Sequence, residues 1–138
     1  RRVVLSPTEC QNVLSKYPEA QIRVESSPIR VFSDSEYSEK GIQVVTDMSS
    51  CDVLLGVKEV PIDALIPNKK YFFFSHTIKK QPYNRELLRA ILEKNIELYD
   101  PEVITNPKGA RLVAFGRYDG FVGAYNCPRP NHCWTNKR

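Results

Sequence analysis

The chain shows two patterns of hydrophobic and polar positions. Apolar residues spaced three to four positions apart predict amphipathic helices, and short apolar runs bounded by turn residues predict strands. The first helix has a clear start, with Ser6 as N-cap, Pro7 at the first helical position and Glu9 placed to complete a capping box. Gly41 is placed to end the second helix. Helices are therefore expected at residues 6–17, 34–41 and 83–95.

Strands are expected at residues 20–25, 42–46, 51–61, 69–76, 96–102 and 111–116. The run at 51–61 is almost continuously apolar, which is typical of a strand buried on both faces, and the strand ends at Lys58 and Glu59 before Pro61. Residues 116–126 carry glycines and can open a further helix. Because strands and helices alternate at short spacing, we expect an α/β domain of right-handed βαβ units, with a mainly parallel, Rossmann-like sheet flanked by helices.

The composition is that of a soluble domain with a single core, since the 138 residues are 41% hydrophobic and 26% charged. The net charge of +4 is spread along the chain, so no nucleic-acid partner is expected. No stretch approaches the roughly 20 apolar residues of a membrane helix, and the charged start lacks the apolar segment of a signal peptide. We therefore expect no membrane partner and a cytoplasmic location, with the mitochondrion as the alternative.

The final residues, 127–138, differ in composition from the rest. They are rich in proline and polar residues and bring Cys127, His132 and Cys133 together. Zinc prefers a tighter C-x-x-C hook and a fourth ligand, so no metal site is expected there. We expect one folded domain at 1–126, followed by an atypical and poorly ordered tail. The chain does not begin with methionine, so we also expect it to lie within a longer protein.

Ionisable residues stand at the ends of three of the expected strands. Lys58 and Glu59 end one strand, His76 ends the aromatic run of the next, and the third closes with Asp100 and Glu102. In an open parallel sheet, ligands bind in the crevice outside the carboxyl ends of the strands. These strand ends therefore indicate a functional edge. The alternative is that they are polar only because they meet water.

The chemistry that suits this edge is proton transfer. Burial and a neighbouring imidazolium both lower the proton affinity of a lysine toward the range of a general base. Glu59 has a second interpretation, as a surface partner of Lys69 or Lys70. Asp100, which precedes Pro101, has a second interpretation as a turn residue. The chain has no G-x-G-x-x-G, Walker or G-x-S-x-G motif, so no cofactor-binding residue is expected in it.

Several motifs together resemble a known family. They are the stretches RRVVLSPTECQNVL, LLGVKEVP, FFSHTIKKQ, LYDPEVI and GARLVAFGRYDGFVGAYN, in this order from Arg1 to Asn126. This series is similar to the N-terminal substrate domain of the lysine-forming saccharopine dehydrogenases and lysine-ketoglutarate reductases. That family is grouped with the alanine dehydrogenases and the nicotinamide nucleotide transhydrogenases. The resemblance implies that lysine and 2-oxoglutarate condense to an imine, which a nicotinamide hydride reduces to saccharopine.

The resemblance also implies roles for particular residues. Lys58 and His76 match the family's acid/base pair, which moves protons while the imine forms and hydrolyses. Four further residues match substrate-binding positions: Arg2, which would hold a substrate carboxylate, the acids Glu59 and Glu102, and Lys79. Lys80 beside Lys79 makes that last assignment ambiguous.

The implied partners are a small amino acid, a 2-oxo acid and a C-terminal dinucleotide-binding domain that holds NAD or NADP. The chain alone is expected to lack dehydrogenase turnover, because that second domain is not part of it. Residues after Asn126 do not follow the family pattern. Two alternatives stay open: the same domain of an alanine dehydrogenase, which keeps the lysine, histidine and arginine, and a binding module of this fold without chemistry.

Overall fold

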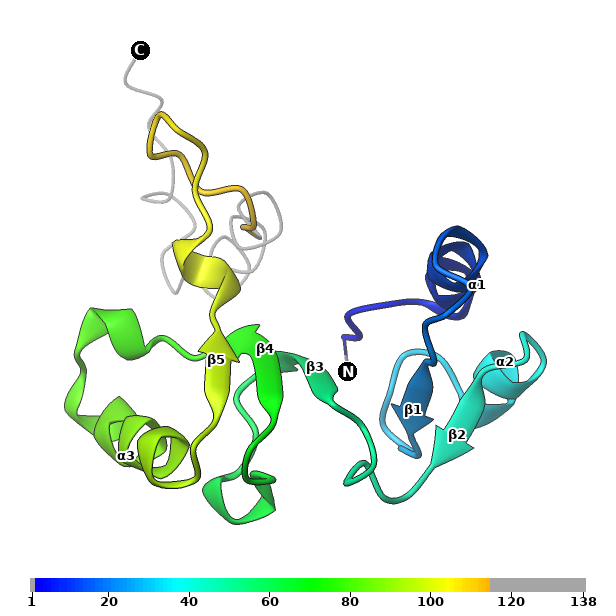
Figure 1. Cartoon of the computed structure of the whole chain (residues 1–138), viewed down its shortest axis with the longest axis horizontal. Helices are drawn as coiled ribbons and strands as arrows, with labels where there is room; N and C mark the ends of the chain where they lie inside the picture. The colour runs from blue at the N-terminus through cyan, green and yellow to red at the C-terminus, as the bar shows by residue number, and fades with distance from the viewer. Residues whose placement is uncertain (1, 115–138) are drawn as a thin grey trace, which may run out of the picture. The chain divides into compact units, whose positions relative to one another are not determined.

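A computed structural model describes residues 2–114 of the chain (Figure 1). The chain divides into a unit of Arg1–Val103 and a second unit that begins at Ile104. The helices are α1 (Pro7–Lys16), α2 (Asp34–Ser38) and α3 (Arg85–Glu93). The strands are β1 (Arg23–Glu25), β2 (Gln43–Val45), β3 (Val53–Lys58), β4 (Lys70–Phe74) and β5 (Glu97–Tyr99). Single 3-10 turns lie at Ile62–Ala64, Thr77–Lys79, Pro82–Asn84 and Pro101–Val103.

The helix starts follow the local sequence. At α1 the Ser6 backbone N–H donates to Glu9 Oε2 at 2.7 Å, and the Glu9 N–H donates to Ser6 Oγ at 3.3 Å. This reciprocal capping box confirms the predicted start. Ser33 and Glu36 repeat the arrangement at α2, and Gly41 follows that helix with a φ of +75° that suits glycine.

All registered strand pairs are parallel, which confirms the predicted α/β class. β1 pairs with β2, and β3, β4 and β5 form a separate sheet in that order, with β4 in the middle. The expected single sheet is therefore present as a two-stranded and a three-stranded sheet. In the three-stranded sheet Val53 pairs with Lys70, and Lys70 pairs with Glu97. The carboxyl ends of β3, β4 and β5 consequently meet at one edge.

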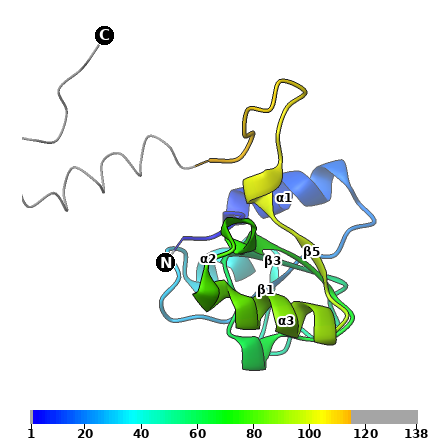
Figure 2. The same cartoon turned by 90° about the vertical axis from the view of Figure 1, so that its left-hand side faces the viewer.

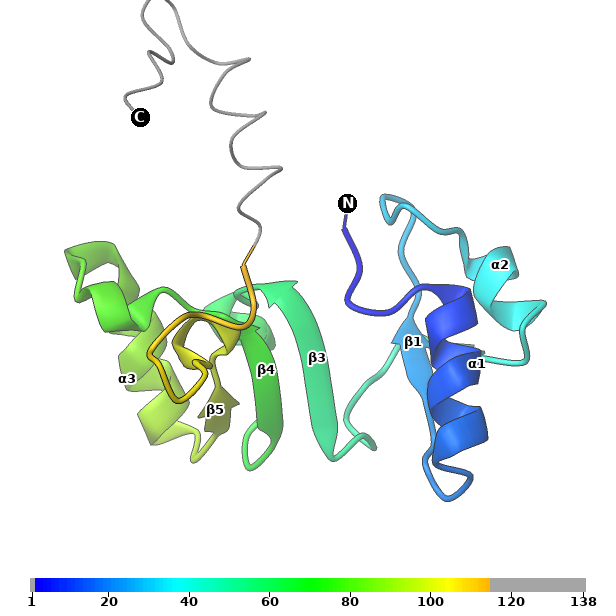
Figure 3. The same cartoon turned by 90° about the horizontal axis from the view of Figure 1, so that it is seen from above.

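Each sheet has its own apolar cluster. On the β1–β2 sheet, beside which α1 lies in Figure 3, the buried members are Cys10, Tyr37 and Ile42. Helix α3 lies along the three-stranded sheet (Figure 2), and its apolar side joins the second cluster. Buried members of that cluster are Leu54, Leu65, Tyr71, Phe73, Leu87, Ala90, Ile91 and Ile96. The sequence places Leu87, Leu88, Ile91 and Leu92 on one face of this helix, and this prediction is only partly right: Leu87 and Ile91 pack in the cluster, whereas Leu88 and Leu92 stay 42% and 71% exposed.

Two strand predictions are wrong in the described residues. β3 is an edge strand, paired only with β4, and its outward side chains Val53 and Leu55 stay 44% and 52% exposed, so it is not buried on both faces. Residues 111–114 form no strand. Instead Arg111 makes one antiparallel bridge with Thr105, because the chain reverses between them. The rest of that predicted strand, the helix expected from 116–126 and the tail lie outside the described residues.

Candidate functional site

Lys58, His76 and Glu102 come together at the carboxyl edge of the three-stranded sheet. Lys58 is the last residue of β3, His76 follows β4, and Glu102 lies in the turn after β5. Lys58 Nζ is 3.2 Å from His76 Nε2, and His76 Nδ1 is 2.9 Å from Glu102 Oε2. The imidazole ring therefore bridges a lysine and a carboxylate that belong to two other strand ends.

The contacts of the ring fix which nitrogen carries its proton. A carboxylate only accepts hydrogen bonds, so Nδ1 donates its N–H to Glu102 and leaves the lone pair of Nε2 facing Lys58. Lys79 Nζ lies 3.3 Å from both His76 Nδ1 and Glu102 Oε1. Since an ammonium cannot donate to a protonated nitrogen, its favourable partner here is the carboxylate. Lys58 and Nε2 are then the pair available for proton transfer.

Glu102 is the electrostatic centre of the group. Its side chain is only 9% exposed and lies between His76 and Lys79. The hydrogen bond from the His76 ring, and then the contact with Lys79, hold the pKa of Glu102 below its ordinary value of 4.5. Glu102 is therefore a carboxylate near neutral pH.

This lowered pKa predicts a pH effect on folding. A carboxyl whose pKa is lower in the folded state adds stability above its unfolded pKa, and that stability is lost as the pH falls through the folded value. We therefore expect Glu102→Gln to lose less unfolding free energy than the parent chain as the pH falls below 4.5. Urea unfolding at pH 7 and at stepwise lower pH measures this. Glu93→Gln, at an exposed position of α3, is the control and should follow the parent. Equal losses of unfolding free energy at low pH in the parent chain and in Glu102→Gln would contradict the lowered pKa of Glu102.

The backbone of His76 is held in the left-handed region, with φ of 56° and ψ of 10°. Few non-glycine residues adopt this region, and histidine does so more often than most. The His76 carbonyl accepts hydrogen bonds from the Lys79 N–H and from Nδ2 of Asn84, each at 3.1 Å. This turn redirects the chain directly after β4 and aims the ring along the strand ends.

Sequence reasoning missed Ser75 and Asn84, which are both buried. It placed Asp100 at the strand-end edge, with a turn residue as the second interpretation, but did not predict its hydrogen bonds. The Ser75 hydroxyl and N–H both donate to Asp100 Oδ2, at 2.6 and 3.1 Å. The only sequence signal was position, because Ser75 directly precedes His76 and Asp100 follows the next strand. Hydrogen bonding between them depends on strand pairing and could not be read from the chain.

Arg2 and Glu59 lie outside the group of contacts described above. Arg2 is exposed and lies on the segment before α1, rather than at a strand end. Glu59 directly follows Lys58 and lines a pocket of about 300 Å³, together with Val60, Pro61, Ile62, Tyr83, Asn84 and Leu87. Lys70, one of its alternative partners, lies 3.8 Å from Glu97. The binding roles of Arg2 and Glu59 stay predictions.

Residues 2–114 contain no group of three or more histidine, cysteine, aspartate or glutamate side chains placed to hold a metal ion. In the same part of the chain, no helix has the length and apolar character needed to cross a membrane.

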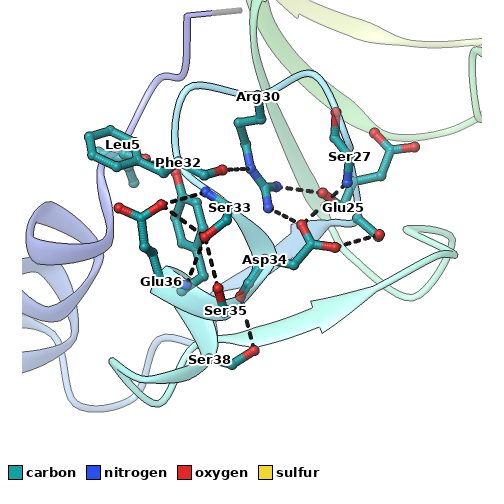
Figure 4. Close-up of polar contacts among 12 residues, drawn as sticks. Leu5, Glu25, Ser27, Arg30, Phe32, Ser33, Asp34, Ser35, Glu36 and Ser38 are labelled. Atoms are coloured by element: carbon teal, nitrogen blue, oxygen red, sulfur yellow. Dashed lines mark hydrogen bonds and ion pairs between the residues drawn. The ribbon is translucent and has the colours of Figure 1, made fainter.

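A second polar cluster surrounds Arg30 in the loop before α2 (Figure 4). Its side chain is 8% exposed; Nε donates to the Phe32 carbonyl at 2.9 Å, and a terminal nitrogen donates to the Glu25 carbonyl at 2.6 Å. The guanidinium also pairs with Asp34 and lies 4.5 Å from the centre of the Tyr37 ring. Its donors point into the loop itself, so this cluster is structural, although a cavity of about 540 Å³ adjoins it.

Arg30→Lys tests this structural role. The charge is kept, but the planar fork that reaches two carbonyls and a carboxylate is lost. We expect a loss of about 1–3 kcal/mol in unfolding free energy, measured by urea unfolding. Arg89→Lys is the matched control, since its pair with Glu86 is exposed and should contribute less than about 1 kcal/mol. Equal effects of the two substitutions would contradict the structural role.

Comparison with known proteins gives one family match. The sequence profile described as "Alanine dehydrogenase/PNT, N-terminal domain" matches residues 1–122. Alpha-aminoadipic semialdehyde synthase of Arabidopsis thaliana is 36% identical over 127 residues, which cover 89% of this chain and 12% of that protein. Mitochondrial alpha-aminoadipic semialdehyde synthase of Bos taurus is 37% identical over 126 residues, covering 91% of this chain and 13% of that protein.

Saccharopine dehydrogenase (NAD(+), L-lysine-forming) of Yarrowia lipolytica is 31% identical over 128 residues, covering 89% of this chain and 34% of that protein. The chain thus spans between 12% and 34% of the length of these relatives.

Proposed function

Because the chain belongs to the alanine dehydrogenase/PNT N-terminal domain family, we propose that it is the substrate-binding and acid/base half of an oxidoreductase that interconverts saccharopine with lysine and 2-oxoglutarate. The observation that carries the proposal is the 3.2 Å contact between Lys58 Nζ and His76 Nε2 at the carboxyl edge of the sheet. The names of the relatives favour saccharopine chemistry over alanine chemistry, since two are aminoadipic semialdehyde synthases and one is a saccharopine dehydrogenase.

In this proposal, Lys58 and His76 move the protons of imine formation and hydrolysis. A bound nicotinamide cofactor would supply the hydride acceptor for the glutarate α-carbon, the carbon whose oxidation leads to lysine and 2-oxoglutarate. Water then adds to the resulting imine carbon, and the carbinolamine breaks its C–N bond to release lysine and 2-oxoglutarate. Nε2 of His76, which faces Lys58, would take a proton from the attacking water, and Lys58 would give a proton to the departing amine. The neutral Lys58 amine would then take the hydroxyl proton as the carbonyl of 2-oxoglutarate forms.

Glu102 serves this chemistry by holding the Nδ1–H of His76, so that Nε2 stays the basic nitrogen. Lys79 balances the Glu102 charge and is 46% exposed, so its ammonium can also meet a substrate carboxylate. We assign Arg2 to a second substrate carboxylate, because a guanidinium binds such a group through paired hydrogen bonds. Glu59, beside Lys58, is assigned to tuning the charge of that lysine.

NAD or NADP is assigned to a C-terminal dinucleotide-binding domain, and residues 1–126 to the substrate domain. We keep the cytoplasm as the proposed compartment. The alternative is the mitochondrion, which the printed name of the Bos taurus relative includes.

A hybrid enzyme tests the function. Residues 1–126 replace the matching region of the Yarrowia lipolytica saccharopine dehydrogenase, which the chain matches over 34% of its length. We expect the hybrid to reduce NAD+ with saccharopine and to oxidise NADH with lysine plus 2-oxoglutarate, but not with pyruvate plus ammonia. A hybrid that binds NAD+ and acts on L-alanine would instead support an alanine dehydrogenase. A hybrid that binds NAD+ and turns over neither substrate would favour the non-catalytic module.

A further inference from the structure

The carboxylate of Asp100 connects the two chain segments that carry His76 and Glu102. Its Oδ2 accepts hydrogen bonds from the hydroxyl and N–H of Ser75, the residue before His76, at 2.6 and 3.1 Å. Its Oδ1 accepts from the backbone N–H of Glu102 itself at 2.8 Å. One side chain therefore ties down the backbone of both members of the histidine–carboxylate pair.

The surroundings make this connection rigid. Ser75 is 1% exposed, and its hydroxyl also lies 2.8 Å from the hydroxyl of Thr77. On the other side of His76, buried Asn84 donates to the carbonyl at 3.1 Å. His76 is thus held from both sides while its backbone keeps the left-handed φ of 56°. Such a conformation persists only where the surrounding structure enforces it.

We infer that Asp100 is a positioning residue. By accepting hydrogen bonds from the backbone N–H groups of Ser75 and Glu102, it sets the separation of His76 and Glu102. That separation in turn decides which nitrogen of the His76 ring carries the proton. The assignment of catalytic consequences rests on the proposed function, but the effect on the ring does not. Asp100 itself touches neither Lys58 nor the His76 ring in any contact described above. Asp100 would therefore affect the chemistry only by placing the Nδ1–H of His76 against the carboxylate of Glu102.

Asp100→Asn is the sharpest test in the 138-residue chain. An amide of the same size has one oxygen that accepts and one NH2 that only donates, so it can satisfy Ser75 or the Glu102 N–H but not both. We expect nitrogen-15 NMR of the His76 ring to shift from the Nδ1–H form toward the tautomer mixture of free imidazole. The carboxyl carbon of Glu102 should titrate closer to 4.5 than in the parent chain.

The matched control is Asp47→Asn. Asp47 also accepts from the N–H and the hydroxyl of one serine, Ser49, at 2.8 and 2.6 Å, but it lies between β2 and β3. The control should leave the His76 ring unchanged. Ser75→Ala, which removes one hydroxyl donor and keeps the N–H, should shift the ring in the same direction by a smaller amount. This milder variant keeps the test decisive if Asp100→Asn fails to fold.

An unchanged His76 tautomer in Asp100→Asn and in Ser75→Ala, or an equal change in Asp47→Asn, would overturn the inference. In the hybrid enzyme, Asp100→Asn should lower kcat about 10–100-fold with little change in KM, since small misplacements of catalytic groups have effects of this size. If the ring shifts as expected while the parent hybrid turns over neither saccharopine nor alanine, the positioning role stands and the proposed function fails.

Discussion

Replacing His76 by glutamine in the hybrid enzyme is expected to lower the turnover of saccharopine about 10²–10⁴-fold, the range that general acid–base groups contribute. Glutamine keeps a polar side chain but cannot take up a proton near neutral pH. KM should change less than kcat, because the ring is assigned to proton transfer and not to holding a substrate carboxylate. Steady-state rates with saccharopine and NAD+ measure both constants.

Lys58→Met should lower the turnover of saccharopine by about the same factor of 10²–10⁴, since it removes the amine that lies 3.2 Å from Nε2 of His76. Because the two groups act as one unit, the double variant should be little worse than either single variant. Lys40→Met is the control, since Lys40 is exposed and belongs to none of the contacts of the site. Turnover within about threefold of the parent in both single variants would contradict the acid/base assignment.

Phe73→Ala is expected to remove about 3–5 kcal/mol of unfolding free energy, the range for truncating a buried aromatic residue. Phe73 is 0% exposed in the middle strand β4, and its ring packs edge to face on Tyr71 with centres 6.0 Å apart. Alanine would leave a cavity between the sheet and α3, and that layer also supports the strand ends. Urea unfolding monitored by circular dichroism measures the loss.

Phe72→Ala is the matched control, one residue away on the other face of β4. The Phe72 ring stacks on exposed Tyr99, with centres 4.5 Å apart, and is only partly buried. Its truncation should cost clearly less than that of Phe73, because solvent already reaches this face of the sheet. Equal losses, or a larger loss for Phe72, would mean that the face packed against α3 is not the main core of this unit.

Local features of the fold were predictable from the sequence because local chemistry decides them. Ser6 and Glu9 cap α1 through hydrogen bonds within one turn, and the apolar spacing of α3 needs only the helical period. The parallel class followed from the alternation of strands and helices. Each of these depends on residues close to one another in the chain.

Burial and sheet membership were less predictable, because they depend on what packs against a strand. Val53 and Leu55 are as apolar as a buried strand requires, yet β3 has a partner on one side only. Arg111 and its neighbours had the composition of a strand, but a turn brings Arg111 back to Thr105. Neither outcome can be read from composition.

The candidate site was also predictable only in part. The rule that parallel strands present their carboxyl ends at one edge pointed to five residues, namely Lys58, Glu59, His76, Asp100 and Glu102. Among them, His76 contacts both Lys58 and Glu102. The family resemblance then assigned catalytic and substrate-binding roles to all of these residues except Asp100. The hydrogen bonds of Asp100 were missed because an aspartate before a proline also fits a simple turn, and its partner Ser75 lies on the neighbouring strand end.

The most direct test of the central claim is an NMR titration of the 138-residue chain with millimolar saccharopine, following the His76 ring and the Lys58 side chain, with L-alanine as control. The account predicts saturable shifts of both groups with saccharopine, absent with L-alanine and lost in Lys79→Met if that lysine binds a substrate carboxylate as proposed. No shift of His76 or Lys58 at saturating saccharopine, in a chain whose other signals show that it is folded, would contradict the assignment of this edge as the substrate site.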